Sequence, residues 1–198
     1  MVRIAIGFAV VCGLTLGVAL TSAADSGFKY IGASKCKTCH KKELIGDQWS
    51  KWEKSGHAKA FKTLQGEKAI AIAKEKGISG PPSEAAECLK CHATAATVGA
   101  DQVEKKPLSN SDGVQCETCH GPGSGYKKKK VMADHEKSLA AGLIVPDEKT
   151  CTQCHNEESP TFAGFDYAEA SKKIDHSIPA DVKGKYIEVE KARKAEGN

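Results

Sequence analysis

The sequence predicts a mainly α-helical chain with much irregular loop and only a sparse core of its own side chains. Three observations lead to this prediction. Short runs with helical periodicity are separated by glycine- and proline-containing breaks. Phenylalanine, tryptophan and tyrosine make up only 6% of the residues, and the mean hydropathy is negative. One five-residue motif recurs four times. Something other than side chains must therefore fill much of the interior.

The recurring motif is Cys-x-x-Cys-His, the attachment signature of a c-type haem. Its two cysteines form thioether bonds to the porphyrin, and the adjacent histidine reaches the iron from one face. The sequence therefore predicts four covalently attached haem c groups that form the core of the fold. The predicted attachment cysteines and proximal histidines are Cys36, Cys39 and His40; Cys88, Cys91 and His92; Cys116, Cys119 and His120; and Cys151, Cys154 and His155.

A single copy of this motif would be ambiguous. It could be half of a zinc knuckle or a redox dithiol, and four cysteine pairs could build two zinc sites or a disulfide framework. Each of the four pairs is followed directly by a histidine, although the chain has only seven histidines. This recurrence favours haem attachment over these alternatives.

The N-terminus resembles a secretory signal peptide. A short basic start ending at Arg3 precedes an apolar run over 4–20, and small residues lead to Ala24. Cleavage before Asp25 would leave a single tetrahaem domain over 25–198. The alternative is a retained membrane anchor, since the apolar run is almost long enough to span a bilayer.

Cleavage would also remove Cys12, the one cysteine outside the four motifs. No thiol would then remain for a disulfide bond or for a catalytic nucleophile. Covalent haem is attached after export in bacteria, so the predicted location is the periplasm, with the cell surface as an alternative.

The formal net charge of +4 does not indicate nucleic-acid binding. Four haems with ionised propionates would bring the oxidised protein close to neutral, and no nucleic-acid-binding motif is present. The four-lysine run Lys127–Lys130 has two interpretations. It could be a solvated patch that offsets propionates, or a docking site for an acidic redox partner.

Helical periodicity predicts five helical segments and several irregular ones. The 41–65 segment should be helical with a break at Ser55-Gly56, and 66–76 should follow as a helix. Ser83 is expected to cap a short helix that carries the second motif. Further helices are expected over 131–141 and 167–173. Residues 93–115 should be irregular, 121–125 should turn, and Tyr186, Ile187 and Val189 could form a short strand.

Three histidines lie outside the motifs: His57, His135 and His176. We expect each to be a distal haem ligand, which leaves one of the four irons without a histidine on its second face. That iron would be five-coordinate or water-bound, or bound by Met132 or a lysine. An open site is favoured over Met132, because this residue lies on a similar helix face to His135.

Four segments resemble the tetrahaem cytochrome c-554 family of multihaem c-type cytochromes. They are Gly32–Cys36, Trp52–Phe61, Gly113–Ser124 and Cys154–Phe162. The resemblance implies a mainly helical protein with closely packed haems, three of them bis-histidine and one five-coordinate. It implies that the second haem is the open one, that His135 serves the first, and that His57 and His176 are shared between the third and fourth. Relatives take electrons from hydroxylamine oxidoreductase and pass them towards the quinone pool.

The predicted function is therefore electron transfer rather than enzymatic catalysis. The expected partners are redox proteins, among them a multihaem oxidoreductase and a quinone-linked membrane cytochrome, with no nucleic acid and no membrane span after cleavage. Two alternatives remain open: reduction of a small nitrogen oxide at the open haem, and a subunit of an extracellular cytochrome filament.

Overall fold

The computed structural model describes residues 27–183 together with 185, 188, 192 and 195. The predicted signal peptide with Cys12 lies outside the described residues. So do the three residues of the possible C-terminal strand.

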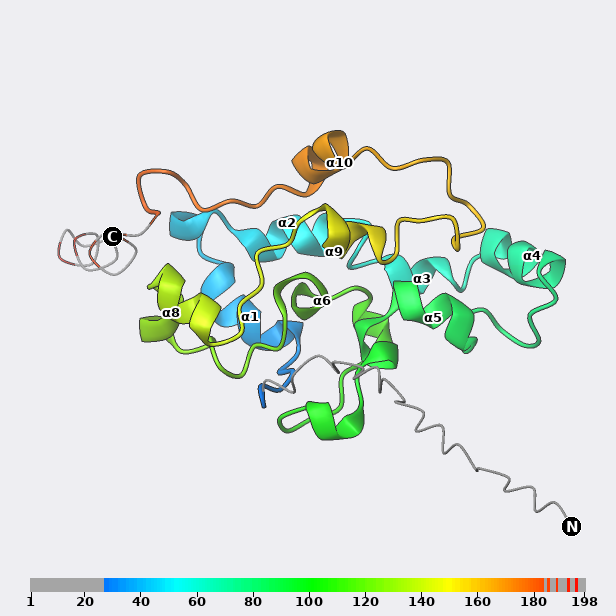
Figure 1. Ribbon diagram of the computed structural model, residues 1–198, viewed down its shortest axis with the longest axis horizontal. Helices are drawn as coiled ribbons and strands as arrows, with labels where there is room; N and C mark the ends of the chain where they lie inside the picture. The colour runs from blue at the N-terminus through cyan, green and yellow to red at the C-terminus, as the bar shows by residue number, and fades with distance from the viewer. Residues whose placement is uncertain (1–26, 184, 186–187, 189–191, 193–194, 196–198) are drawn as a thin grey trace, which may run out of the picture.

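The described part of the chain is built from short helices joined by loops, which confirms the predicted fold class (Figure 1). Its one β pairing is an isolated parallel bridge between Tyr30 and Val103. The α-helices are α1 (Ala33–His40), α2 (Gln48–Lys54), α3 (Ala60–Thr63), α4 (Glu67–Glu75), α5 (Ala86–His92), α6 (Cys116–His120), α7 (Lys129–Met132), α8 (His135–Ala140), α9 (Glu148–Thr152) and α10 (Tyr167–Ile174). The 3-10 helices are η1 (Glu43–Ile45), η2 (Thr94–Thr97), η3 (Ala100–Gln102) and η4 (Asn110–Asp112).

Aspartate side chains set the start of four helices. Asp47, Asp134, Asp147 and Asp166 each accept a hydrogen bond from the backbone N–H three residues further on, at α2, α8, α9 and α10. Such caps satisfy N–H groups that the first helical turn leaves without partners. The prediction of one continuous helix over 131–141 was wrong. Asp134 caps α8, and the segment is therefore divided between α7 and α8.

Two other predicted boundaries differ from the structure. The 41–65 segment is interrupted earlier than Ser55-Gly56, because Gly46 adopts a left-handed conformation after η1. Helix α5, which carries the second motif, has Ala85 and not Ser83 at its cap position, and no side chain caps it. The predicted irregular segment 93–115 contains only the short helices η2, η3 and η4.

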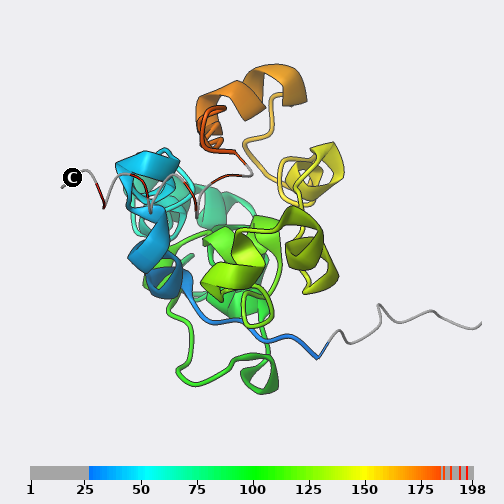
Figure 2. The same ribbon diagram turned by 90° about the vertical axis from the view of Figure 1, so that its left-hand side faces the viewer.

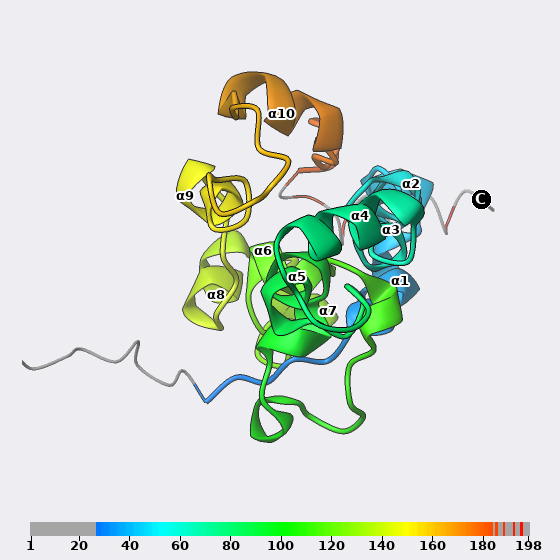
Figure 3. The ribbon, with the colours of Figure 1, turned by 90° about the vertical axis from the view of Figure 1, so that its right-hand side faces the viewer.

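The haem motifs occupy helix ends. Helices α1, α5 and α6 each end at a motif histidine, and α9 contains Cys151. Figure 1 shows α6 near the centre, α1 and α8 towards one end, and α4 towards the other. Helix α10 stands at the edge of the molecule in the views from both ends (Figures 2 and 3).

Few side chains form a core. The buried apolar residues are Ala33, Ile45, Leu64, Ala73, Leu89, Ala93, Tyr126 and Val182. Leu64, Leu89 and Ala93 pack together beneath the second motif, with Phe61 and Cys88 beside them. A side-chain core this small is what the composition predicts, and it leaves room for prosthetic groups.

The segment before the third motif is bonded to the segment that carries His57. Val114 donates a backbone hydrogen bond of 2.9 Å to the carbonyl of His57, and Trp52 Nε1 donates one of 2.9 Å to the carbonyl of Val114. Gly113 lies at the contact with φ of +65°, and a Cβ there would be 2.6 Å from the His57 carbonyl oxygen. The close approach therefore requires glycine.

We expect Gly113→Ala to destabilise the protein by about 1–3 kcal/mol more than Gly77→Ala. Both glycines have a similar positive φ, +65° and +68°, but a Cβ at Gly77 would meet nothing within 4 Å. The control variant therefore carries the cost of left-handed alanine without the steric clash. The measurement is guanidinium unfolding followed by tryptophan fluorescence. Equal losses in the two variants would contradict the close approach.

Candidate haem-binding site

Two pairs of histidines from distant parts of the chain face each other. The ring centres of His57 and His155 are 6.0 Å apart with an interplanar angle of 77°. Those of His120 and His176 are 5.8 Å apart at 83°. A metal–imidazole bond is about 2 Å long, so two imidazoles on opposite sides of one ion have ring centres about 6 Å apart. Each pair has the spacing that a shared iron requires.

Three motif histidines are oriented by hydrogen bonds at Nδ1. His40 donates to Gln48 Oε1 at 3.3 Å, His92 to the carbonyl of Ala60 at 2.8 Å, and His120 to the carbonyl of Ile144 at 3.1 Å. An acceptor at Nδ1 selects the tautomer whose Nε2 has a free lone pair. These imidazoles can therefore bind a metal through Nε2.

The predicted distal ligand His176 has the same arrangement. Its Nδ1 donates a hydrogen bond of 2.7 Å to the carbonyl of Ile174, the last residue of α10. The segment that follows α10 thus contributes an oriented imidazole, although α10 lies at the edge of the molecule.

Burial favours the neutral form of several of these rings. It lowers the pKa of His40, His57 and His120 below the usual value, and neighbouring histidines lower it further. His120 and His40 both lie close enough to His176 for its charge to contribute. Neutral imidazole is the form that binds a metal, so this electrostatic effect supports a ligand role.

The fourth motif and the remaining candidates differ in their surroundings. His155 stacks on Phe165, with ring centres 4.9 Å apart and an angle of 18°. His135 is exposed at the first position of α8, and Met132 is half-buried at the end of α7. Among the described residues, the ring contacts between histidines include His57 and His176 but not His135.

Cysteines of different motifs interact with one another. Cys36 and Cys116 share a side-chain hydrogen bond, which raises the pKa of Cys36 and lowers that of Cys116. Burial and the nearby Cys151 raise the pKa of Cys119 to about 11. Burial and Cys91 raise the pKa of Cys154 to about 12. None of the eight described cysteines forms a disulfide bond, so these interactions join motifs without disulfide bonds.

The surroundings of the motifs fit a large apolar group with carboxylate substituents. Trp49 Nε1 and Gln115 Nε2 are buried donors without a hydrogen-bond partner. A haem propionate is an acceptor that could bond to such donors. Large apolar side chains are exposed next to the ligand segments, where a macrocycle could cover them; they are Ile144, Val145, Phe162, Ile174 and Ile178. The residues present therefore fit haem c.

The buried carboxylate of Glu117, inside the third motif, is a feature that the sequence analysis missed. Its side-chain oxygens accept hydrogen bonds from the backbone N–H groups of Ile31, at 2.9 Å, Gly32, at 2.7 Å, and Gly123, at 2.7 Å. Burial raises the pKa of Glu117, and these three bonds oppose the shift. Glu117 occupies one of the two variable positions of Cys-x-x-Cys-His. The motif therefore gives no indication that this side chain forms such hydrogen bonds.

Gln48 is a second functional residue that the analysis missed, since its side chain orients His40. In the part of the chain that the structure describes, no helix has the length and apolar character needed to cross a bilayer.

Haem-attachment motifs on short helices, with oriented imidazoles beside them, define the class of the protein as a c-type cytochrome. The family model for cytochrome c554 and c-prime matches residues 35–121. Cytochrome c-554 of Nitrosomonas europaea is 31% identical over 183 residues, which cover 82% of this chain and 72% of that protein. The chain belongs to the cytochrome c-554 family. No solved structure matches it significantly.

Proposed function

We propose that the protein is a periplasmic tetrahaem c-type cytochrome that carries electrons between redox proteins. The short-range interactions between cysteines of different motifs are the observation that supports this most strongly. They join the attachment points in the order first, third, fourth and second motif. When bound, haem c supplies a one-electron Fe(III)/Fe(II) couple. Attachment points this near to one another would keep successive redox groups close enough for electron transfer without diffusion.

The proposed ligand pairs follow from the histidine geometry. His57 and His155 would serve the fourth haem, and His120 and His176 the third, because each pair has a ring separation near 6 Å. This proposal assigns His57 and His176 to separate haems, which the sequence alone did not do. His135 would serve the first haem together with His40, as the family resemblance implies.

The second haem would then have His92 on one face and an open or non-histidine position on the other. His92 is well placed as a proximal ligand, because the Ala60 carbonyl orients it and Thr63 Oγ1 lies 3.2 Å from its Nδ1. The alternative function, reduction of a small nitrogen oxide, would use this open position. Only the count of seven histidines for four irons favours it.

A haem assay combined with low-temperature EPR tests the proposal on the purified oxidised protein. We expect four haems per chain, one quarter of them high-spin and three quarters low-spin. Mass spectrometry should show a mature chain that begins at Asp25 and carries four covalent haems. Fewer haems would contradict the tetrahaem assignment, and a wholly low-spin spectrum would contradict the open second site.

A further inference from the structure

Three segments that are distant in the sequence meet beside the first motif. Tyr30 N donates to the carbonyl of Gln102 at 2.8 Å, and Glu104 N donates to the carbonyl of Tyr30 at 2.9 Å. On the other side of this segment, Ser124 N donates to the carbonyl of Lys29 at 3.0 Å, and Lys29 N donates to Ser124 Oγ at 2.7 Å. The segment around residue 30 therefore lies between the 102–104 and 123–127 segments.

This meeting concentrates positive charge. Lys127 forms an ion pair with Glu104, and Lys105 and Lys35 lie close enough to lower the pKa of that carboxyl group further. One carboxylate thus has lysines around it from three parts of the chain. Lys128 and the rest of the lysine run continue from the same place and are exposed.

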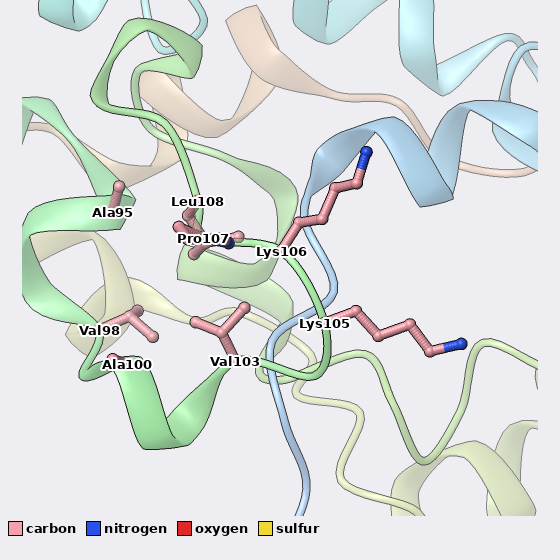
Figure 4. A pocket seen from close by; sticks show the side chains of 8 residues that line it. All are labelled: Ala95, Val98, Ala100, Val103, Lys105, Lys106, Pro107 and Leu108. Carbon is pink, nitrogen blue, oxygen red and sulfur yellow. The ribbon is translucent and has the colours of Figure 1, made fainter.

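An apolar cavity lies within the basic region. It has a volume of about 280 Å³ and is lined by Val98, Val103, Pro107 and Leu108, among others. Lys105 and Lys106 form its rim, and Figure 4 shows their side chains extending away from it, with Lys106 pointing towards α1. An apolar centre with a charged rim is the usual anatomy of a transient protein interface.

We propose that Lys35, Lys105, Lys106 and Lys127–Lys130, together with this cavity, form a docking surface for an acidic redox protein. The partner would present carboxylates to the lysines and one apolar side chain to the cavity. Charge complementarity is the argument for an acidic partner, and the apolar cavity favours a protein over a polyanion without apolar groups. This inference rests on the proposed function and names the end of the protein at which electrons enter or leave.

The position of the docking surface identifies the haem that it serves. Lys35 directly precedes Cys36 in α1, so the first attachment motif lies at the edge of the surface. In the proposed order of motifs the first is one end and the second, with its open position, is the other. Electrons would therefore enter or leave at the end opposite the open iron.

A charge-reversal experiment on the holo-protein tests the docking surface. The probe is reduced plant-type ferredoxin, an acidic one-electron donor of low reduction potential. Its [2Fe–2S] cluster is oxidised by one electron as one ferric haem becomes ferrous. We expect the double variant Lys106→Glu/Lys128→Glu to lower the second-order rate at low ionic strength about 10-fold. The difference should shrink to less than about 2-fold at 0.5 M salt, because salt screens exposed charges.

The matched control is Lys68→Glu/Lys76→Glu at helix α4, which changes the net charge equally at exposed positions. Figure 1 shows α4 at the far end of the molecule. We expect the control to slow the reaction less than about 2-fold. Equal slowing by both variants, or by neither, would overturn the docking surface.

Haem content and full reduction by dithionite, measured on the same samples, keep the two proposals apart. If haem content and dithionite reduction are normal but the two double variants behave alike, only the docking surface fails. If the protein lacks four reducible haems, the proposed function fails, and the docking proposal fails with it.

Discussion

Replacing His57 with alanine is expected to double the high-spin haem content of the oxidised protein, from one haem in four to two. The ring of His57 faces His155 at 6.0 Å, and in the proposed ligation alanine could not replace His57 as a ligand of the fourth iron. Loss of that strong-field ligand would leave the iron five-coordinate or water-bound, and thus high-spin. EPR spin quantification and the number of carbon monoxide molecules bound per chain should both report the change.

His176→Ala should produce the same increase at a different haem, because His176 faces His120 in the second ring pair. The double variant should then have three high-spin haems in four, since separate sites act additively. The control is Lys59→Ala, which removes an exposed side chain two residues from His57. An unchanged low-spin spectrum in His57→Ala would rule out this residue as a ligand.

Replacing Glu117 with alanine is expected to lower the stability of the holo-protein by about 3–5 kcal/mol. The carboxylate is only 1% exposed and accepts hydrogen bonds from three backbone N–H groups. Each hydrogen bond to a charged group contributes about 1.5–3 kcal/mol, and its loss leaves a buried donor without a partner. For a chain of this size, the loss corresponds to a fall in Tm of about 10 °C.

Glu117→Gln should have an intermediate effect, because the amide oxygen can still accept from Ile31 and Gly123 while the amide nitrogen cannot accept from Gly32. The control is Glu87→Ala, which removes an exposed carboxylate directly before the second motif. Thermal unfolding followed by circular dichroism compares the three variants. A fall in Tm no larger for Glu117→Ala than for Glu87→Ala would contradict the structural role of the carboxylate.

The sequence predicts the local features of this protein well. A haem motif is a spacing of five adjacent residues, so no knowledge of the fold is needed to recognise it. Capping is equally local, and Asp134 could have been recognised as the signal that divides α7 from α8. The prediction that Ser83 caps this helix was wrong. A serine marks the start of a helix only where the residues directly after it adopt the helical conformation, and α5 begins at Ala86.

The pairing of distant groups could not be predicted from the sequence. His57 and His155, or Glu117 and Ile31, are far apart along the chain, and their meeting depends on how the loops fold. The same holds for the lysines around Glu104, which come from three segments. The lysine run Lys127–Lys130 was visible as a charge cluster, but its place beside the first motif was not.

The acceptors at the motif histidines differ in how they can change during evolution. His92 and His120 donate to backbone carbonyls, which every amino acid supplies, so substitution alone cannot remove them. His40 donates to the side chain of Gln48, which a single codon change can replace. Because an acceptor at Nδ1 modulates ligand basicity and hence iron potential, the haem proposed at the first motif would have an adjustable potential. Selection could then retune the docking end of the protein for a new partner while the other proposed haems keep their potentials.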